Sequence, residues 1–580
     1  MKHVRIAMVQ MNATVGDIQA NTTKILAGIR QAKAAEADIV TFPELAVTGY
    51  PPQDLLLKPQ FLEENRTALK RICEAAAGIT AVVGFVDQEN DIYNAAAVVH
   101  DRELLGIQHK VYLPNYGVFD ENRYFQAGVP KQIFQIGEIT FGVNICEDIW
   151  YPEGPTVIQA LSGADLILNC SASPYYMGKP AHRERLTAVR ASDSVVVVAY
   201  NNLVGGQDRL IFDGGSLVVD QTGVILARGK LFEEDFIVAD IDLADVERSK
   251  LSDPRHRKAV FELQLSDRPM QEHVTADSML GHNPPKERKS AQMAAMPADE
   301  AQEIYDALTL GLRDYVHKNG FSKAVLGLSG GIDSSLVAAL AVDALGAENV
   351  MGILLPGPYS SQGSIDDAKQ LADNLGMPYQ IVRISPIFDA FMQELEAAFE
   401  GREPDVAEEN IQARIRGVVW MALSNKFGYL PLTTGNKSEM SVGYATMYGD
   451  MSGGLAVIAD VPKTTVYALS EYRNRAAGCD LIPRNAIDKP PSAELRADQK
   501  DSDSLPEYHI LDAILKAYIE HDKSVDDIIA QGFDPAVVKD IIQKVDHSEY
   551  KRQQAAPALK VTTKAFGPDR RLPITNKYYG

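Results

Sequence analysis

The amino-acid sequence predicts an α/β fold in two domains, and three observations support this. Short apolar runs alternate with helix-like patterns in both halves of the chain. The length of 580 residues is enough for two or more domains with full cores. A polar, proline-bearing stretch at 265–297, which includes Asn-Pro-Pro-Lys-Glu-Arg-Lys at 283–289, has no apolar period. We therefore expect domains at 1–264 and 298–580, joined by a linker at 265–297.

Each half supplies its own set of expected elements. In the first half the apolar runs predict strands at 6–10, 39–42, 81–85, 140–145, 166–169, 195–200 and 215–219. Helix-like patterns cover 21–36 and 61–77 there, and a helix-like pattern resumes at 298–317 in the second half. An apolar run at 324–328 then predicts a strand that leads into a second helix. We find no internal repeat that would make the halves copies of one another.

Composition and charge narrow the class of protein. With 46% hydrophobic and 23% charged residues, the chain is typical of a soluble globular protein. A formal charge of −21 argues against a nucleic-acid partner, whose phosphates would be repelled. We see neither a signal peptide nor an apolar stretch of membrane length. The four cysteines form no CxxC pair, so we expect neither a disulfide framework nor a zinc site, and we expect a cytoplasmic protein.

The most informative motif is Ser329-Gly330-Gly331-Ile332-Asp333-Ser334-Ser335, between an apolar run and a helix-like run. Adjacent glycines let backbone N–H groups surround phosphate oxygens, and a helix N-terminus favours an anion. The loop lacks the lysine of a Walker A motif, and Asp333 instead offers a carboxylate for Mg²⁺. This favours cleavage of ATP between its α- and β-phosphates. The alternative is a glycine turn that only caps a helix.

Three separated residues in the first half could hydrolyse an amide. Glu44 and Cys146 each follow a predicted strand, and Lys110 precedes a proline-bearing turn. Glu44 would take the thiol proton, Cys146 would attack the carbonyl, and Lys110 would stabilise the oxyanion. We also expect the ammonium to lower the thiol pKa. Taken singly, such residues are usually solvated or structural, and the other cysteines (Cys73, Cys170 and Cys479) are interpreted as buried filler.

The order of these motifs resembles known families. Phe-Pro-Glu, His-Lys-Val-Tyr-Leu-Pro and Ile-Cys-Glu-Asp resemble the nitrilase superfamily, which carries a Glu-Lys-Cys triad. The Ser-Gly-Gly-Ile-Asp-Ser-Ser loop resembles the N-type ATP pyrophosphatases. Together, and over nearly the whole chain, they resemble the family of glutamine-dependent NAD⁺ synthetases. The resemblance implies an N-terminal nitrilase-like αββα sandwich and a C-terminal Rossmann-like parallel-sheet domain.

The resemblance also implies roles for particular residues of this chain. Tyr116, Ser173 and Lys179 would contact glutamine, beside the triad Glu44, Lys110 and Cys146. The implied ATP contacts are Leu328, Ser329, Gly330, Gly331, Ile332, Asp333, Ser334, Ser335, Thr434, Lys463 and Ser492. The implied contacts with deamido-NAD⁺ (nicotinic acid adenine dinucleotide) are Asn410, Arg414, Glu439 and Lys551. Asp333 and Glu439 would hold Mg²⁺.

The implied reaction adenylates a carboxylate, because a bare carboxylate oxygen will not leave. Ammonia from glutamine then attacks the adenylate and yields NAD⁺ and AMP, with pyrophosphate and glutamate as the other products. We expect direct transfer of ammonia, since free ammonia is mostly ammonium at neutral pH. A homo-oligomer, with a dimeric synthetase core or larger, is also implied. The alternatives are another adenylating amidotransferase, making GMP or asparagine, and a non-catalytic nucleotide-binding scaffold.

Overall fold

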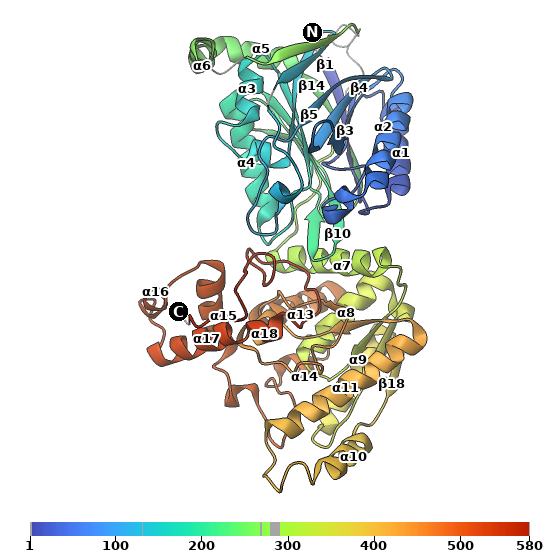
Figure 1. The fold of residues 1–580 in the computed structure, drawn as a ribbon, viewed down its shortest axis with the longest axis vertical. Coiled ribbons are helices and arrows are strands. Elements are labelled where there is room, and N and C mark those ends of the chain that lie inside the picture. The colour runs from blue at the N-terminus through green and yellow to red at the C-terminus, as the bar shows by residue number, and fades with distance from the viewer. Residues whose placement is uncertain (1–2, 130, 267–269, 279–290, 579–580) are drawn as a thin grey trace. The chain divides into compact units, whose positions relative to one another are not determined.

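The computed structural model describes residues 3–129, 131–266, 270–278 and 291–578, and the stretch at 283–289 of the expected linker lies outside them. The chain divides into two compact units (Figure 1). The first comprises residues 1–207 and 212–296, and the second comprises residues 208–211 and 297–580.

The first unit contains two large sheets. One has the spatial order β14-β1-β2-β3-β4-β5, and the other has the order β13-β12-β9-β8-β7-β6-β15. Parallel pairing joins β1 to β2 and β2 to β3 in one sheet, and β7 to β8 and β8 to β9 in the other. The strands are β1 His3–Gln10, β2 Ile39–Thr41, β3 Thr80–Gln88, β4 Ile92–His100, β5 Glu103–His109, β6 Gln132–Ile136, β7 Ile139–Ile145, β8 Leu166–Ser171, β9 Val197–Asn202, β10 Val204–Gln207, β11 Leu210–Asp213, β12 Leu217–Val219, β13 Ile225–Arg228, β14 Asp235–Asp242 and β15 Glu272–Ala276.

Side chains from both sheets form one core between them. Met8 of β1 and Val82 of β3 share this core with Phe141 of β7 and Leu168 of β8, and all four are fully buried. On the outer faces, α1 and α2 contact the first sheet, while α3 and α4 contact the second. The expected αββα sandwich is therefore confirmed. The helices are α1 Ile18–Ala34, α2 Pro59–Ala75, α3 Pro155–Leu161, α4 Lys179–Ser194, α5 Leu243–Ser252 and α6 Pro254–Leu265.

The structure differs from the sequence prediction within the expected linker. Residues Glu272–Ala276 form β15, which pairs in parallel with β6 at the edge of the second sheet. All five side chains are exposed or half-buried. The pairing is made by backbone groups, so an apolar pattern was not needed and none is present to indicate the strand.

The second unit is built on one parallel sheet with the order β18-β17-β16-β19-β20. Its strands are β16 Ala324–Gly327, β17 Val350–Leu354, β18 Tyr379–Ile381, β19 Leu430–Thr433 and β20 Leu455–Ala456. Its helices are α7 Glu300–Lys318, α8 Ile332–Leu345, α9 Gln362–Leu375, α10 Ser385–Leu395, α11 Val406–Phe427, α12 Lys437–Val442, α13 Lys463–Ala477, α14 Arg484–Asp488, α15 Tyr508–Leu515, α16 Val525–Ile529, α17 Pro535–His547 and α18 Glu549–Arg552.

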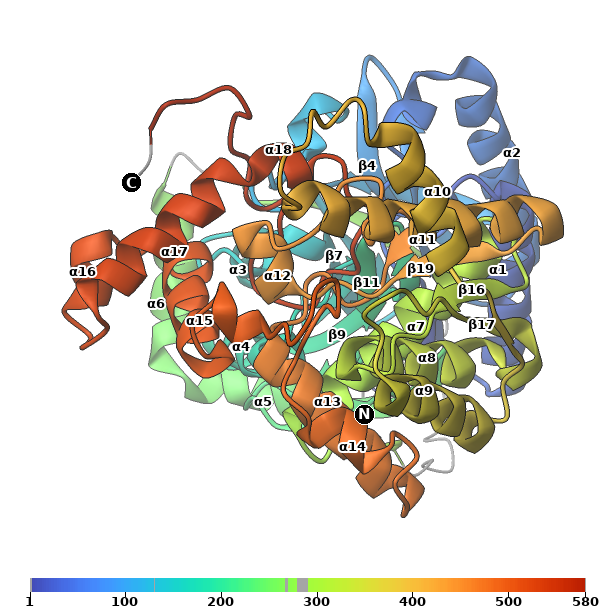
Figure 2. The same ribbon diagram turned by 90° about the horizontal axis from the view of Figure 1, so that it is seen from below.

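The strand order of this sheet determines where a ligand can bind. After β16 the chain adds β17 and β18 on one side, and it then returns to place β19 and β20 on the other side. The crevice beyond the carboxyl ends of β16 and β19 is thus the switch point of an open parallel sheet, where ligands bind. Helices α15 and α17 pack around a separate apolar core, to one side of this sheet in Figure 2. The expected Rossmann-like parallel sheet is confirmed.

Among the described residues, no helix combines the length and the apolar character that crossing a membrane requires.

Candidate functional site

Three chemically active side chains of the first unit meet because each follows the end of a strand. Glu44 lies three residues after β2, Lys110 directly after β5, and Cys146 directly after β7. Lys110 Nζ donates to Glu44 Oε1 at 2.7 Å. Glu44 also accepts hydrogen bonds from Asn94 Nδ2 at 2.7 Å and from the backbone N–H of Ala172 at 2.9 Å. All three active side chains are buried.

A second buried carboxylate completes the surroundings of Lys110. Glu121 Oε1 accepts from Lys110 Nζ at 2.7 Å and from the Tyr50 hydroxyl at 2.8 Å. Burial disfavours the ammonium of Lys110, but the charges of Glu121 and Glu44 outweigh it and raise the lysine pKa well above its ordinary value. Burial is also the main reason that the pKa of Glu121 is raised. Lys110 therefore stays protonated at neutral pH.

The Cys146 thiol differs from the sequence prediction. Burial raises its pKa well above the ordinary value, Glu44 raises it further, and Lys110 only partly offsets these effects. The ammonium does lower the thiol pKa, as expected, but burial, which is the largest effect, and the Glu44 charge outweigh it, so the net direction is upward. Cys146 has φ of +44°, a conformation uncommon for a side chain other than glycine, so the backbone turns sharply at the thiol.

Asp148 connects the cysteine turn to the lysine loop. Its carboxylate accepts the backbone N–H of Ile145 at 3.0 Å on one side. On the other side it accepts those of Val111 at 3.0 Å and Tyr112 at 2.9 Å. Burial raises the pKa of Asp148 to about 7, against the opposing effect of these N–H donors. This carboxylate holds the segments after β5 and β7 in register.

The three sequence-predicted glutamine contacts lie around the same thiol loop. The Tyr116 hydroxyl donates to Glu147 Oε1 at 2.8 Å, next to Cys146 in the chain. The backbone N–H of Ser173, which follows β8, donates to Asn202 Oδ1 at 3.0 Å. Lys179 begins α4, and its ammonium lies 3.9 Å from the centre of the Trp150 ring. Burial lowers the pKa of Lys179 to about 8.

In the second unit the glycine-rich loop connects β16 to α8 at the switch point. Gly330 has φ of +78°, and a Cβ there would lie 2.1 Å from the carbonyl oxygen of Ser364. Only glycine fits this position. The Ser334 and Ser335 hydroxyls are buried and donate to the Gly331 carbonyl at 3.0 and 2.8 Å. Those two serines therefore hold the backbone conformation of the loop through its Gly331 carbonyl.

Opposite the loop, the segments after β19 and β20 meet the first turn of α8. Asn436 Nδ2 donates to Asp333 Oδ1 at 3.0 Å, and the Lys463 ammonium contacts Asp333 Oδ2. Lys463 Nζ also lies 4.0 Å from Glu439 Oε1. Burial and the Asp333 charge raise the pKa of Glu439, although Lys463 opposes them. One ammonium thus faces two carboxylates in a buried setting.

These groups line a cavity of about 450 Å³. Of the sequence-predicted ATP and dinucleotide residues, the lining includes Leu328, Ser329, Gly331, Ile332, Asp333, Asn410, Thr434, Glu439, Lys463, Ser492 and Lys551. Gly330, Ser334, Ser335 and Arg414 are not among the lining residues. Arg414 is exposed and donates to the Met447 carbonyl at 3.2 Å, whereas Arg416, two residues later on α11, does line the cavity.

Comparison with known proteins finds a family match for each unit and relatives that match the whole chain. A carbon-nitrogen hydrolase model matches residues 5–250, and an NAD synthase model matches residues 304–555. The glutamine-dependent NAD(+) synthetase of Thermotoga maritima is 48% identical, with 100% of this chain and 99% of the relative covered. The chain belongs to the glutamine-dependent NAD⁺ synthetase family.

Further relatives of this synthetase extend the likeness to solved structures. The Aquifex aeolicus glutamine-dependent NAD(+) synthetase is 47% identical, over 99% of this chain and 100% of the relative. A solved structure of the glutamine-dependent NAD+ synthetase from Acinetobacter baumannii, in complex with adenosine diphosphate, is 41% identical. It has a TM-score of 0.75 and covers 99% of each chain.

Three acidic residues of this synthetase site were missed from the sequence. Glu121 lies in the charged run Asp120-Glu121-Asn122-Arg123, which is typical of a solvated loop, and nothing in that run indicates burial. Asp148 was visible as the end of Ile-Cys-Glu-Asp, but its acceptor role depends on the fold. Asp501 lines the ATP-side cavity and accepts from the Tyr508 hydroxyl at 2.8 Å, and it lies nine residues after the predicted Ser492 without a motif of its own. The interpretation of the other cysteines as buried filler is wrong for Cys479, which is exposed, and for Cys73, which is half-buried.

Proposed function

We propose that this chain amidates deamido-NAD⁺ to NAD⁺, using ATP and the amide nitrogen of glutamine. The observation that carries the proposal is the presence of two sites on one chain. One has a buried carboxylate, ammonium and thiol, and the other has a glycine loop facing two carboxylates and a lysine. The first chemistry releases ammonia, and the second consumes it.

In the first unit, Cys146 would attack the side-chain carbonyl of glutamine. The thiol proton passes to Glu44, the C–N bond breaks, and Glu44 returns the proton to the departing ammonia. The thioester is then hydrolysed by water to give glutamate and the free thiol. The raised thiol pKa fits this sequence, because a protonated nucleophile needs a base that takes its proton as attack begins.

Lys110 is placed to stabilise the oxyanion. An ammonium has three N–H donors, and Glu44 and Glu121 each accept one of them. The remaining donor is available to the oxygen on which negative charge develops. The two carboxylates keep the lysine protonated and fix its position, so this donor is already aimed before the substrate arrives.

In the second unit, the loop N–H groups and Lys463 would hold the phosphates of ATP while the nicotinate carboxylate attacks the α-phosphorus. The bond to the β-phosphate oxygen breaks, and pyrophosphate leaves. Ammonia then attacks the acyl adenylate, and AMP departs. Thr434 and Ser492 line the same cavity and are assigned to ATP, while Asn410 and Lys551 are assigned to deamido-NAD⁺. Arg414 keeps that assignment from the family pattern alone.

The acidic pair of this cavity suits Mg²⁺. Burial, and then the nearby Asp333 charge, raise the pKa of Glu439, and the single ammonium of Lys463 faces both carboxylates. Hard carboxylate oxygens are the donors that Mg²⁺ prefers. Asp333 and Glu439 would hold the ion, which would neutralise charge on the pyrophosphate.

The full-length similarity to NAD⁺ synthetases favours this acceptor over GMP or asparagine synthesis. The decisive assay incubates the purified chain with deamido-NAD⁺, ATP, Mg²⁺ and glutamine. We expect NAD⁺, AMP, pyrophosphate and glutamate in equal amounts. Formation of ADP and orthophosphate would refute the adenylation step, and absence of AMP with every acceptor would favour a non-catalytic scaffold.

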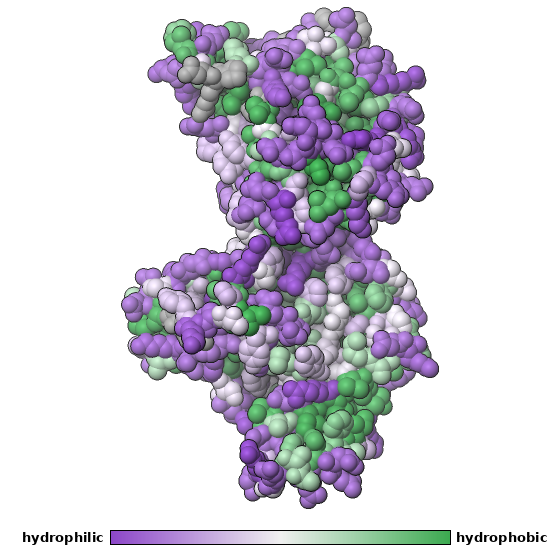
Figure 3. Space-filling view, in the orientation of Figure 1, coloured by the Kyte–Doolittle hydropathy of each residue, from purple (hydrophilic) through white to green (hydrophobic). Residues whose placement is uncertain are grey.

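We also propose that the second unit forms a homodimer or larger homo-oligomer through an apolar face. Ile387 and Phe391 of α10 are exposed, as are Val418 and Phe427 of α11. Figure 3 shows a green patch over these helices. Single exposed apolar side chains are ordinary, but a contiguous group marks an interaction surface. Phe391→Glu should shift the mass measured by light scattering toward the monomer.

We further place the enzyme in the cytoplasm, because its chemistry depends on a reduced cysteine. The four cysteines are free in the structure, including the nucleophile.

A further inference from the structure

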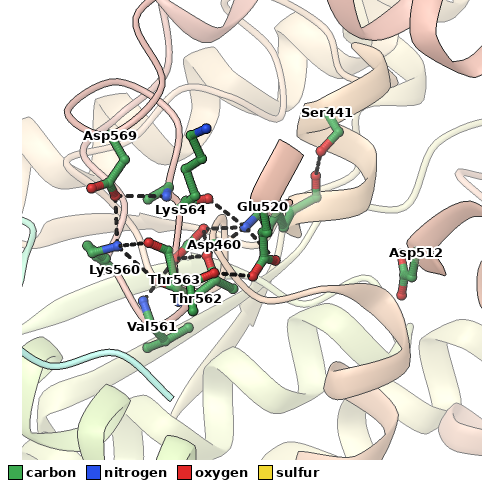
Figure 4. Close-up of polar contacts among 12 residues, drawn as sticks. Ser441, Asp460, Asp512, Glu520, Lys560, Val561, Thr562, Thr563, Lys564 and Asp569 are labelled. Atoms are coloured by element: carbon green, nitrogen blue, oxygen red, sulfur yellow. Dashed lines mark hydrogen bonds and ion pairs between the residues drawn. The ribbon is translucent and has the colours of Figure 1, made fainter. Parts of the chain in front are cut away.

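A C-terminal segment, residues 560–564, is bonded into the framework of the ATP cavity although it lies beyond the matched NAD synthase region, which ends at residue 555. Figure 4 shows these residues around Asp460, with Asp569 beside Lys560 at the left of the view. The segment supplies none of the residues that line the cavity. Its contacts run instead to residues that stand next to the cavity groups in the chain.

Asp460 is the first anchor of the segment. This buried carboxylate accepts the backbone N–H groups of Val561 at 2.9 Å and Thr562 at 2.8 Å. It also accepts the Thr562 hydroxyl, at 2.8 and 2.9 Å from its two oxygens. Burial opposes ionisation of Asp460, but the charges of Lys437 and Lys560 lower its pKa. The carboxylate is therefore ionised and saturated with donors.

Lys437 is the second anchor. Its buried ammonium donates to the Thr562 hydroxyl at 2.6 Å and to the Lys564 carbonyl at 2.9 Å, and it lies 3.1 Å from Asp460 Oδ1. Glu520 Oε1 accepts from it at 3.3 Å. The Thr562 hydroxyl thus stands between the ammonium and the carboxylate, as acceptor for one and donor to the other.

Both anchors adjoin the residues that contact Asp333. Lys437 directly follows Asn436, whose amide donates to Asp333, and Asp460 lies three residues before Lys463, whose ammonium contacts Asp333. The backbone N–H of Lys437 also donates to the carbonyl of Val461 at 2.9 Å, so the two segments are joined directly. A shift at either anchor would therefore move a group on the metal and phosphate side of the cavity.

Lys560 stiffens the segment from within. Its ammonium donates to the carbonyls of Thr562 at 2.8 Å and Thr563 at 3.2 Å, and to Asp569 Oδ2 at 2.7 Å. A buried ionic network of this kind is weak evidence for stability, since apolar residues can pack as well or better. The network instead fixes the position of the segment, because each of its charges has a fixed partner.

We propose that Thr562 is a positioning residue of the ATP site. Through Asp460 and Lys437 it holds the starts of α13 and α12 in register, so that Lys463 and Asn436 both reach Asp333. The inference rests on the proposed function, because the group it positions acts in the ATP-dependent step.

Three variants of the full chain test this. Thr562→Val removes the shared hydroxyl but keeps the side-chain shape and the backbone N–H contact with Asp460. Thr562→Ser keeps the hydroxyl and should retain normal activity and Mg²⁺ dependence. Thr563→Val is the matched control, because its exposed hydroxyl donates at 2.6 Å to Glu520 Oε2, whereas Lys437 donates to Glu520 Oε1, and this hydroxyl contacts neither Asp460 nor Lys437.

In ammonium-fed NAD⁺ synthesis, we expect Thr562→Val to lower kcat by about tenfold and to raise the half-saturating Mg²⁺ concentration by about tenfold, the scale of one hydrogen bond to a charged group. Thr562→Ser and Thr563→Val should stay within about twofold of the unchanged chain. A second readout needs no turnover, because Trp420 lines the cavity and Trp150, the other tryptophan, belongs to the first unit. Tryptophan fluorescence during titration with Mg²⁺ and ATP should show weaker nucleotide binding in Thr562→Val alone.

Two results would overturn the proposal. One is a Thr562→Val enzyme equal to the unchanged chain in kcat, Mg²⁺ dependence and ATP affinity. The other is a lower kcat with both dependences unchanged, which is what a smaller folded fraction produces. If Thr562→Val does not fold, Lys437→Arg keeps the charge and displaces the contact, and unchanged Mg²⁺ and ATP dependence there would overturn the proposal equally. A wild-type chain that makes no NAD⁺ would refute the proposed function, while the fluorescence comparison would still decide the role of Thr562.

Discussion

Gly84 offers a sharp test of how the Glu44 loop is held. Gly84 lies in β3, and the loop that carries Glu44 packs directly on its backbone. A Cβ at this position would lie 2.2 Å from the Pro43 carbonyl oxygen and 2.5 Å from the Leu45 nitrogen, whereas real Cβ contacts essentially never fall under 3.0 Å. Backbone atoms cannot rotate aside as a side chain can. Gly84→Ala must therefore displace the loop by most of an ångström.

The expected size of the effect follows from that displacement. Moving a catalytic group by about 1 Å can cost about 10²-fold in rate. We expect Gly84→Ala to reduce glutamate release by about this factor, while ammonium-fed NAD⁺ synthesis in the second unit stays close to that of the unchanged chain. Both rates are measured on the same preparation, with AMP quantified as the product of the second.

Controls separate this effect from a general loss of folding. Gly363→Ala adds a methyl group with no contact within 4 Å in the described part of the chain, so it should leave both rates unchanged. Gly84→Ser, with one more atom, should lose at least as much glutaminase activity as Gly84→Ala. A folded Gly84→Ala protein that releases glutamate within about threefold of the normal rate would show that the loop tolerates the shift, and the reasoning would fail.

Four further predictions follow from the two sites. Cys146→Ala should abolish glutamine-dependent synthesis and leave ammonium-dependent synthesis intact, and loss of both in a folded protein would contradict the separation of roles. Lys110→Met should lower the glutaminase rate by about 10²–10³, as for one lost oxyanion donor, and a change of only a few-fold would exclude that role. Because burial lowers the pKa of Lys179 to about 8, its ammonium is lost as the pH rises through that value. KM for glutamine should then rise, and Lys179→Arg, which stays charged, should flatten the profile; an unchanged slope would remove Lys179 from the glutamine site. Asp333→Asn should abolish NAD⁺ formation from either nitrogen source while glutamate release persists, and retained AMP production would rule out its role.

The sequence predicted the frame of the molecule well because its signals are local. The strands around Ile6, Val40 and Val143 and the loop at Gly330 follow from apolar runs and glycine spacing, and these elements appear where expected. The edge strand β15 was missed because none of its side chains is fully buried, so its sequence shows no apolar strand pattern.

The site was harder to predict where burial decides the chemistry. The sequence placed Lys110 and Cys146 in one group but gave no measure of how many carboxylates surround them. In the structure, burial of the thiol is the largest effect, and with the charges of Glu44 and Glu121 it raises the thiol pKa although Lys110 lowers it. Glu121 itself could not be found from its charged neighbours, because its burial depends on how the loop after Tyr116 folds back.

The protonated resting state of Cys146 bears on how this enzyme withstands oxidants. Peroxides and alkylating reagents react with thiolates, and a buried neutral thiol offers them little. Cys479 is exposed, so it is the site at which such reagents meet the chain first. Cys146 would become reactive as Glu44 takes its proton during attack on a bound amide, so burial protects the thiol between turnovers.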